Sequence, residues 1–172
     1  LESSFMPAAS CSAKIHVLPG DVVSRIAAGE VIERPAAVVK ELLENSLDAG
    51  GLHITIDVKD GGLALIRVTD DGEGISRADL PRAFERHATS KLRSDRDLAS
   101  VTTMGFRGEA LPSIASVSHV LVTTATRQDM VGAQLTLVAG AGSSIVDAPA
   151  VPGTRIDVSN LFFNQPARKK FL

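Results

Sequence analysis

The spacing of apolar residues changes at Gly50-Gly51, and this change limits the chain to folds that combine helices with a sheet. Before the glycines, the segment 38–50 (VVKELLENSLDAG) places apolar side chains on about half of a helical circumference. They are Val38, Val39, Leu42, Leu43, Leu47 and Ala49. After the glycines, the segment 53–59 (HITIDVK) alternates, with Ile54, Ile56 and Val58 on one face. The sequence therefore predicts an amphipathic helix followed by a half-buried strand.

The rest of the chain continues this mixture of elements. A short helix is expected over Val22–Ile32 and a turn at residues 60–62; Pro35 suits the first turn of the helix that follows. Residues 63–70 (LALIRVTD) predict a central strand, and Ser76 with Asp79 resembles a capping box. A further helix is expected over Gly108–Ser118, then strands within residues 119–126, 133–139, 143–150 and 154–162. We therefore expect an α+β, two-layer sandwich with helices on one face of a mixed, largely antiparallel sheet.

Length and composition narrow the classes of protein to consider. The 172 residues suffice for one domain, and with 3% aromatic residues the core must consist of Val, Ile, Leu and Ala. A net charge of −2 gives no overall electrostatic signal for nucleic acid binding. The single Cys11 excludes an internal disulfide, four scattered histidines argue against a zinc site, and no apolar run is long enough for a membrane helix. We expect a disordered leader over 1–14, partly a cloning remnant before Met6, and the domain over 15–172.

Polar side chains follow one border of the first helix. Glu41, Asn45 and Asp48 have i, i+4, i+7 spacing, and Asn45 lies at the edge of the apolar stripe, whereas Lys40 and Glu44 are expected to face water. This row of acceptors is either a binding site or the wetted margin of a helix.

Residues 69–75 (TDDGEGI) end the central strand with a carboxylate and two alternating glycines. Gly72 and Gly74 leave a stretch of backbone that a flat ligand could approach, while Asp70 could accept hydrogen bonds from an adenine amino group. An ordinary Asp-Gly turn is the alternative.

Two later segments have features of phosphate binding. Residues 102–113 (TTMGFRGEALPS) lead from glycines into a helix start, where free N–H groups and the helix dipole favour anions. Residues 86–91 (RHATSK) add hydroxyl and basic side chains within the irregular stretch 86–108. The alternatives are a plain glycine-rich connection and a solvated loop.

Taken together, these segments resemble a known family. The stretches AAGEVIERPAAVVKELLENSLDAG, TDDGEGI, RHATSK, GFRGEAL and NQPARKKFL look like the N-terminal ATPase domain of the MutL family of DNA mismatch repair proteins. The chain is similar, more distantly, to the GHKL superfamily of gyrase, heat-shock chaperones and histidine kinases. The resemblance covers residues 15–172. Gln165 departs from the family, which usually has a small or β-branched residue before PAR.

The resemblance implies a role for each matching residue. Glu41 would be the general base that activates water, and Asn45 would hold the Mg²⁺ that bridges the phosphates. Asp70 would bind the adenine amino group, supported by Thr154 through a shared water, and Gly72 and Gly74 would let the base pass. A lid would close over the phosphates, formed by Thr89, Ser90, Lys91, Gly105, Phe106, Arg107, Gly108, Glu109, Ala110 and Leu111. Asp48 would have a supporting role.

The resemblance also implies a function. The chain would bind ATP and Mg²⁺, hydrolyse ATP slowly, and use ATP as a conformational switch that couples mismatch recognition to repair. A lysine from a following domain assists hydrolysis in the family, so slow turnover is expected of these residues alone. Implied partners are MutS, a downstream nuclease or helicase, DNA through the full-length protein, and a second full-length copy; the fragment would be monomeric without nucleotide. A bacterial cytoplasmic, nucleoid-associated location is implied.

Two other functions stay open from the residues alone. A nucleotide-sensing scaffold would bind ATP or ADP without turnover, although Glu41 argues against it. A DNA-binding module without nucleotide chemistry conflicts with the near-neutral charge.

Overall fold

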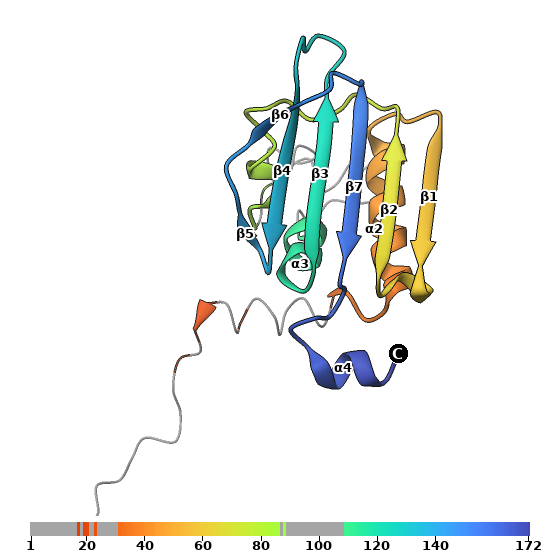
Figure 1. The fold of residues 1–172 in the computed structure, drawn as a ribbon, viewed down its shortest axis with the longest axis vertical. Coiled ribbons are helices and arrows are strands. Elements are labelled where there is room, and N and C mark those ends of the chain that lie inside the picture. The colour runs from red at the N-terminus through yellow and green to blue at the C-terminus, as the bar shows by residue number, and fades with distance from the viewer. Residues whose placement is uncertain (1–16, 18, 21–22, 24–30, 87, 89–108) are drawn as a thin grey trace, which may run out of the picture.

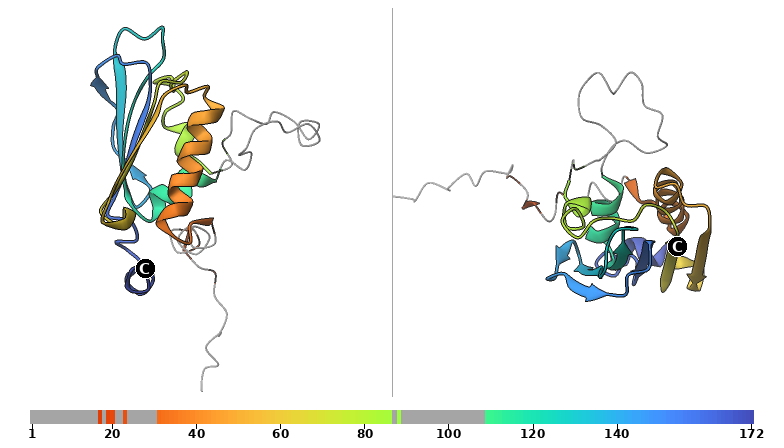
Figure 2. Two further views of the ribbon diagram at one scale, coloured as in Figure 1. Left: turned by 90° about the vertical axis from the view of Figure 1, so that its right-hand side faces the viewer. Right: turned by 90° about the horizontal axis from the view of Figure 1, so that it is seen from above.

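The chain forms two layers, a sheet with helices on one face. The computed structural model describes residues 17, 19–20, 23, 31–86, 88 and 109–172. Figure 2 shows helices α2 (Pro35–Asp48) and α3 (Ala110–Ser116) on the same face of the sheet. The expected leader over 1–14 and most of the expected helix over 22–32 lie outside the described residues. None of the described helices is long and apolar enough to cross a membrane.

The described residues form a sheet of seven strands in the order β1-β2-β7-β3-β4-β5, with β6 paired to β4 (Figure 1). Every pairing among the described strands is antiparallel. The strands are β1 (Ile54–Lys59), β2 (Leu65–Asp70), β3 (His119–Ala125), β4 (Gly132–Val138), β5 (Ala141–Gly142), β6 (Val146–Ala148) and β7 (Gly153–Ser159). The predicted α+β sandwich is confirmed, and β2 is central as predicted, because it lies between β1 and β7.

Short helical elements connect the strands. The predicted turn after β1 is the 3₁₀ helix η1 (Asp60–Gly62), and α4 (Pro166–Lys170) follows β7. The predicted capping contact forms, since Ser76 Oγ lies 2.8 Å from Asp79 Oδ2 and the Asp79 N–H donates to Ser76 Oγ at 3.2 Å. It opens turns that lead into the 3₁₀ helix η2 (Arg82–Phe84).

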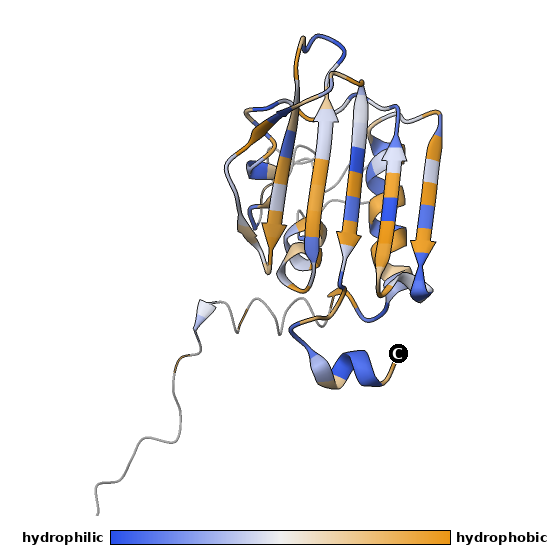
Figure 3. Cartoon of the chain, in the orientation of Figure 1, coloured by the Kyte–Doolittle hydropathy of each residue, from blue (hydrophilic) through white to orange (hydrophobic). Residues whose placement is uncertain are grey.

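The core lies between α2, α3 and the inward faces of β2, β7 and β3. Alternation along the strands places apolar residues on that face, as the bands in Figure 3 show for β2 and β7. Buried members are Ile66, Val68, Val120, Val122, Ile156 and Val158 from the strands, with Val38, Leu42 and Ile114 from the helices. The core is mainly aliphatic, as predicted, but Phe162 is a fully buried member of it, so the prediction of a core of Val, Ile, Leu and Ala alone is wrong at this position.

The predicted half-buried strand is wrong for most of β1. Ile54 packs against the core, but Ile56 and Val58 are exposed although they lie on the same face. The reason is the position of β1 at the edge of the sheet, where its apolar face has a neighbouring strand on one side only.

The predicted orientation of α2 also needs correction. The buried row is Val38, Leu42 and Ser46, with four-residue spacing, while Leu47 is 47% exposed. Glu44 was expected in water, yet its side chain is 19% exposed and ion-paired with Lys40 at 3.1 Å. Because Ser46 rather than Leu47 points inward, the helix is rotated relative to the prediction.

A charge cluster lies on the sheet face opposite the helices. The carboxylate of Asp157 accepts two hydrogen bonds from Arg67 and two from Arg155, all at 2.9 Å. Burial by itself would raise the pKa of Asp157, but the hydrogen bonds from Arg155 and Arg67 outweigh it and lower the pKa to about 2. Asp157 therefore joins β2 and β7 through charge-assisted hydrogen bonds.

We predict that Asp157→Asn lowers the free energy of unfolding at pH 7 by roughly 2 kcal/mol, because a pKa lowered in the folded state stabilises the charged form. The stabilisation is present above the ordinary pKa of 3.8 and disappears as pH falls through about 2. Urea unfolding between pH 7 and pH 2 should show the two proteins converging below about pH 4. Asp147→Asn, which removes an exposed pair with Arg77, is the control. A difference that does not change with pH would contradict the prediction.

Candidate functional site

Asp70 is the centre of the candidate site. Its position at the end of β2 places a carboxylate on the helix-covered face of the sheet, where it is 8% exposed. Oδ1 accepts hydrogen bonds from the N–H groups of Gly72 (3.0 Å) and Thr154 (3.2 Å). Oδ2 accepts one from the hydroxyl of Ser46 (2.8 Å). A carboxylate has about four acceptor positions, so one position on Oδ2 remains available among the described residues.

Ser46 is a site residue that the sequence analysis missed. It is 4% exposed and brings the C-terminal half of α2 against the end of β2. One signal could have found it, because Ser46 lies four residues after Leu42 and continues the buried row of the helix. A hydroxyl at a buried helix position needs a partner.

Thr124 is a second residue that was missed, and it supports Thr154. Its Oγ1 accepts from the Ile75 N–H (2.8 Å) and donates to the Gly153 carbonyl (2.9 Å). Thr154 Oγ1 lies 3.1 Å away. A hydroxyl has one hydrogen to donate, so the Thr154 hydroxyl is the donor between the two threonines. The Thr154 oxygen then keeps its lone pairs as acceptors, and the Thr154 N–H donates to Asp70.

The alternating glycines have a packing role. A Cβ at Gly72 would lie 2.7 Å from the Ala49 carbonyl oxygen, and a Cβ at Gly74 would lie 2.1 Å from the Ala125 carbonyl oxygen. Gly74 also has φ +73. The chain after β2 therefore runs against the end of α2 and the end of β3, which side chains at these positions would prevent.

Asp71 has a different role from its neighbour. Its Oδ1 accepts from the N–H groups of Leu52 (2.7 Å) and His53 (2.8 Å), and Oδ2 lies 2.7 Å from His53 Nδ1. These contacts, the His53 backbone hydrogen bond first, hold the pKa of Asp71 well below its usual range. Asp71 thus fixes the segment that enters β1.

Glu41 and Asn45 lie on the same helix as Ser46. They are one turn apart, about 6 Å along the axis, and Asn45 directly precedes the residue that contacts Asp70. The Glu41 side chain is 28% exposed, and its Oε1 lies 3.8 Å from Lys40 Nζ. The hydrogen bond with Glu44 raises the pKa of Lys40, so its ammonium stays charged beside both carboxylates.

Part of the predicted lid falls outside the described residues. Thr89, Ser90, Lys91 and the segment 105–108 are not described. Glu109 precedes α3 and Ala110 begins it, with the Ser113 N–H donating to the Glu109 carbonyl at 3.0 Å. Pro112 lies in the first turn of this helix, as predicted. Within the described ranges, no three His, Cys, Asp or Glu side chains come together to hold a metal ion.

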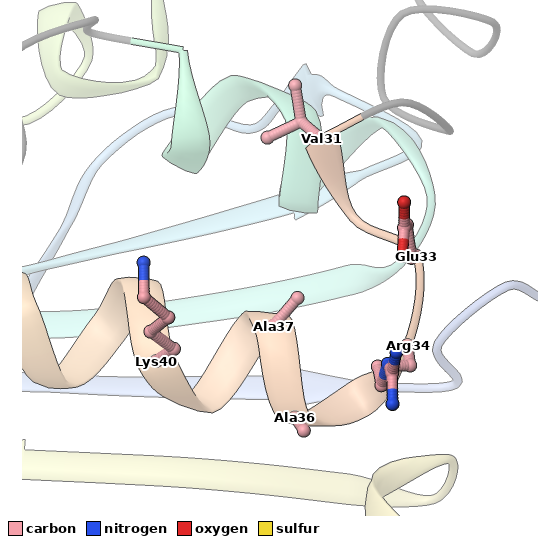
Figure 4. A pocket seen from close by; sticks show the side chains of 6 residues that line it. All are labelled: Val31, Glu33, Arg34, Ala36, Ala37 and Lys40. Carbon is pink, nitrogen blue, oxygen red and sulfur yellow. The ribbon is translucent and has the colours of Figure 1, made fainter.

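An open hollow of about 340 Å³ lies at the start of α2. Figure 4 shows its six lining residues, from the segment before α2 and from the first turns of the helix: Val31, Glu33, Arg34, Ala36, Ala37 and Lys40. Asp70, Ser46, Glu41 and Asn45 do not line it, but Lys40, which does, lies beside Glu41.

Two glycines with nearly equal φ test the packing role of Gly74. Both Gly50 (φ +72) and Gly74 (φ +73) have a left-handed backbone, but a Cβ at Gly50 would meet nothing within 4 Å. We predict that Gly50→Ala destabilises the fold by about 1–2 kcal/mol, the cost of that backbone conformation alone. Gly74→Ala should cost at least twice as much, because the Ala125 carbonyl must move. Equal losses in thermal or urea unfolding would show that this contact relaxes freely.

Comparisons with known proteins agree with this geometry. The family of histidine kinase-, DNA gyrase B- and HSP90-like ATPases matches residues 33–161. MutL of Syntrophotalea carbinolica is 55% identical over 94% of this chain and 26% of that protein. MutL of Bacillus licheniformis is 56% identical over 93% of this chain and 25% of that protein. The chain thus spans about a quarter of the length of these curated relatives.

Solved structures show the same fold. The Aquifex aeolicus MutL ATPase domain complexed with ADP has a TM-score of 0.65 and 34% identity, covering 83% of this chain and 48% of that one. The N-terminal domain of a DNA repair protein gives a TM-score of 0.71 and 35% identity over 87% of this chain and 42% of that one. The chain therefore belongs to the histidine kinase-, DNA gyrase B- and HSP90-like ATPases, within their MutL branch of DNA mismatch repair proteins.

Proposed function

We propose that this domain binds ATP beside Asp70 and hydrolyses it with Glu41 as the general base. The observation that carries the proposal is the Asp70 carboxylate, which is held by three hydrogen bonds and keeps an acceptor position on Oδ2. The ADP in the similar Aquifex aeolicus structure supports an adenine nucleotide as the ligand.

Adenine recognition follows from the hydrogen bonds of Asp70. Because Oδ1 already accepts two N–H groups and Oδ2 accepts the Ser46 hydroxyl, the carboxylate is held rigidly before a ligand arrives. The adenine amino group is a donor that matches the remaining acceptor. The Thr154 oxygen supplies a second acceptor, through a shared water, and Gly72 and Gly74 keep the passing backbone close to the ring.

Hydrolysis would use two polar side chains of α2, Glu41 and Asn45. Glu41 would take a proton from the attacking water, and Asn45, one turn on, would hold Mg²⁺. The donor set fits this ion, because Mg²⁺ takes one or two protein oxygens and completes its shell with phosphates and water. A neutral amide also adds no negative charge beside a triphosphate. When bound, the ion would neutralise charge on the phosphates.

Phosphate binding would use the start of α3 and the segments before it. We propose that Thr89, Ser90, Lys91 and residues 105–111 close over the phosphates. The described part of this region contains the start of a helix, where N–H groups without helical partners favour anions.

The biological role is proposed from the MutL branch. Hydrolysis is slow and Mg²⁺-dependent, and ATP binding orders the lid and promotes dimerisation of the full-length protein. The switch then signals between MutS and a downstream nuclease or helicase, with DNA bound by the full-length protein, in the bacterial cytoplasm at the nucleoid. The MutL relatives, at 55% and 56% identity, support this proposal.

We predict that Glu41→Gln keeps nucleotide affinity and lowers ATP turnover by roughly 10²-fold or more, because the general base is lost. Glu44→Gln removes the same charge from the same helix and is the matched control; it should retain most of the turnover. Phosphate release and calorimetric binding separate the two effects. Turnover in Glu41→Gln equal to that of the control would end the assignment.

Asp70 and Asn45 should affect binding in different ways. Asp70→Asn keeps the shape of the side chain but places an amide donor where adenine needs an acceptor, so ATP and ADP should both bind at least about 10-fold more weakly. Asn45→Ala should weaken the Mg²⁺-dependent part of binding and leave the Mg²⁺-free affinity unchanged. Normal ADP binding by Asp70→Asn would mean that Asp70 does not recognise adenine.

A further inference from the structure

Residues 160–168, which follow β7 and include the first three residues of α4, connect three elements of the candidate site at the far end of the sheet from Asp70. β7 begins beside Asp70 and ends at Ser159, so the segment starts a full strand length away. Figure 1 shows α4 beyond the end of the sheet where β7 finishes. Its contacts reach the segments that lead into α2 and β2 and the end of α3.

Backbone and amide hydrogen bonds fix two of these connections. The Leu161 N–H donates to the Leu63 carbonyl (3.0 Å), just before β2. The Phe162 N–H donates to the Val117 carbonyl (2.8 Å), and Asn164 Nδ2 donates to the Ser116 carbonyl (2.9 Å), at the end of α3. The segment is therefore anchored to β2 and α3 independently of its contact with α2.

Phe162 is the rigid part of this segment. Its side chain is fully buried, and its φ of +62 is unfavourable for a residue with a large side chain. Such a conformation persists only when the surroundings determine it. The ring is therefore a fixed surface on which another group can be placed.

Arg168 joins this surface to α2. Its guanidinium carbon lies 5.5 Å from the centroid of the Phe162 ring. Its Nη1 donates to the carbonyl of Ile32 at 3.0 Å, and Ile32 is fully buried three residues before Pro35 begins α2. The bond therefore connects the entrance of α2 to the anchored segment.

We propose that Arg168 is a positioning residue for ATP hydrolysis, which it serves by fixing the entrance of α2. The inference rests on the proposed function of Glu41 and Asn45. Glu41 lies six residues after Pro35, about 9 Å along the helix, so a shift at the entrance moves Glu41 with the helix. The Ser46–Asp70 contact holds the other end of α2, so adenine binding does not depend on Arg168.

The chemistry of arginine suits this position. A planar guanidinium stacks on an aromatic face while it donates a hydrogen bond sideways, whereas a lysine ammonium is a compact charge. Arg168→Lys should therefore keep part of the ATP turnover that Arg168→Gln loses. Lys169→Gln removes the same charge from the next residue, which is exposed, and is the matched control.

The experiment compares wild type with these three variants by steady-state ATP turnover, calorimetric ADP binding and hydrogen–deuterium exchange. We expect Arg168→Gln to lower kcat by at least about 10-fold, since small misplacements of a catalytic group have effects of this size. The Kd for ADP should stay within about 2-fold of wild type, α2 amides should exchange faster, and β3 and β7 amides should be unchanged. Arg168→Lys should be intermediate, and Lys169→Gln should match wild type.

Three results would overturn the inference: an unchanged kcat in Arg168→Gln, unchanged exchange in α2, or faster exchange across the whole sheet with a parallel loss of ADP binding. The last result would mean that Arg168 contributes to the stability of the whole fold and not specifically to the position of α2. Failure of the proposed function looks different, because the wild type would then neither bind ADP nor release phosphate. Exchange in α2, which needs no nucleotide, would still test the contact.

Discussion

The carboxylate of Asp70 is the interaction on which the rest of the site depends. Removing a carboxylate from water is costly unless hydrogen bonds compensate for the lost hydration. Here the donors come from three places, which are the hydroxyl of Ser46 on α2, the N–H of Gly72 after β2, and the N–H of Thr154 on β7. The group is thus both a recognition element and a junction between helix and sheet. The backbone after Asp70 is packed tightly as well, since a Cβ at Gly72 would meet the Ala49 carbonyl oxygen and one at Gly74 the Ala125 carbonyl oxygen.

The helix α2 links recognition to chemistry. One end contacts Asp70 through Ser46, and the carbonyl of Ile32 before its other end accepts a hydrogen bond from Arg168. Glu41 and Asn45 lie between these two contacts. In our proposal, the Ser46–Asp70 contact and the Arg168–Ile32 contact fix the two ends of α2 independently, and together they fix the position of Glu41 and Asn45. A bound nucleotide that changes either contact would move Glu41 and Asn45 with the helix. This is a physical basis for an ATP-dependent switch.

Much of the architecture could be predicted from the sequence because it follows from periodicity. The switch at Gly50-Gly51 marked the end of α2 and the start of β1, and Pro112 fitted the first turn of α3. Burial of individual side chains was less predictable. The apolar pattern favoured Leu47 inward, but the buried position belongs to Ser46, since a hydroxyl could pair there with Asp70 from a strand 24 residues away. The same limitation hid Thr124 and the contact of Arg67 on β2 with Asp157 on β7, which forms only because these strands are neighbours.

The central claim is that Asp70 binds a hydrogen-bond donor on the base. Calorimetric titration with ADP and with inosine diphosphate tests this directly, because the two ligands share ribose and phosphates and differ where adenine carries its amino group. Inosine places a carbonyl oxygen there, facing an acceptor that three hydrogen bonds hold in position. Our account predicts that inosine diphosphate binds at least about 100-fold more weakly than ADP, the scale expected when a buried polar group is left unpaired. Equal affinities for the two nucleotides would contradict it.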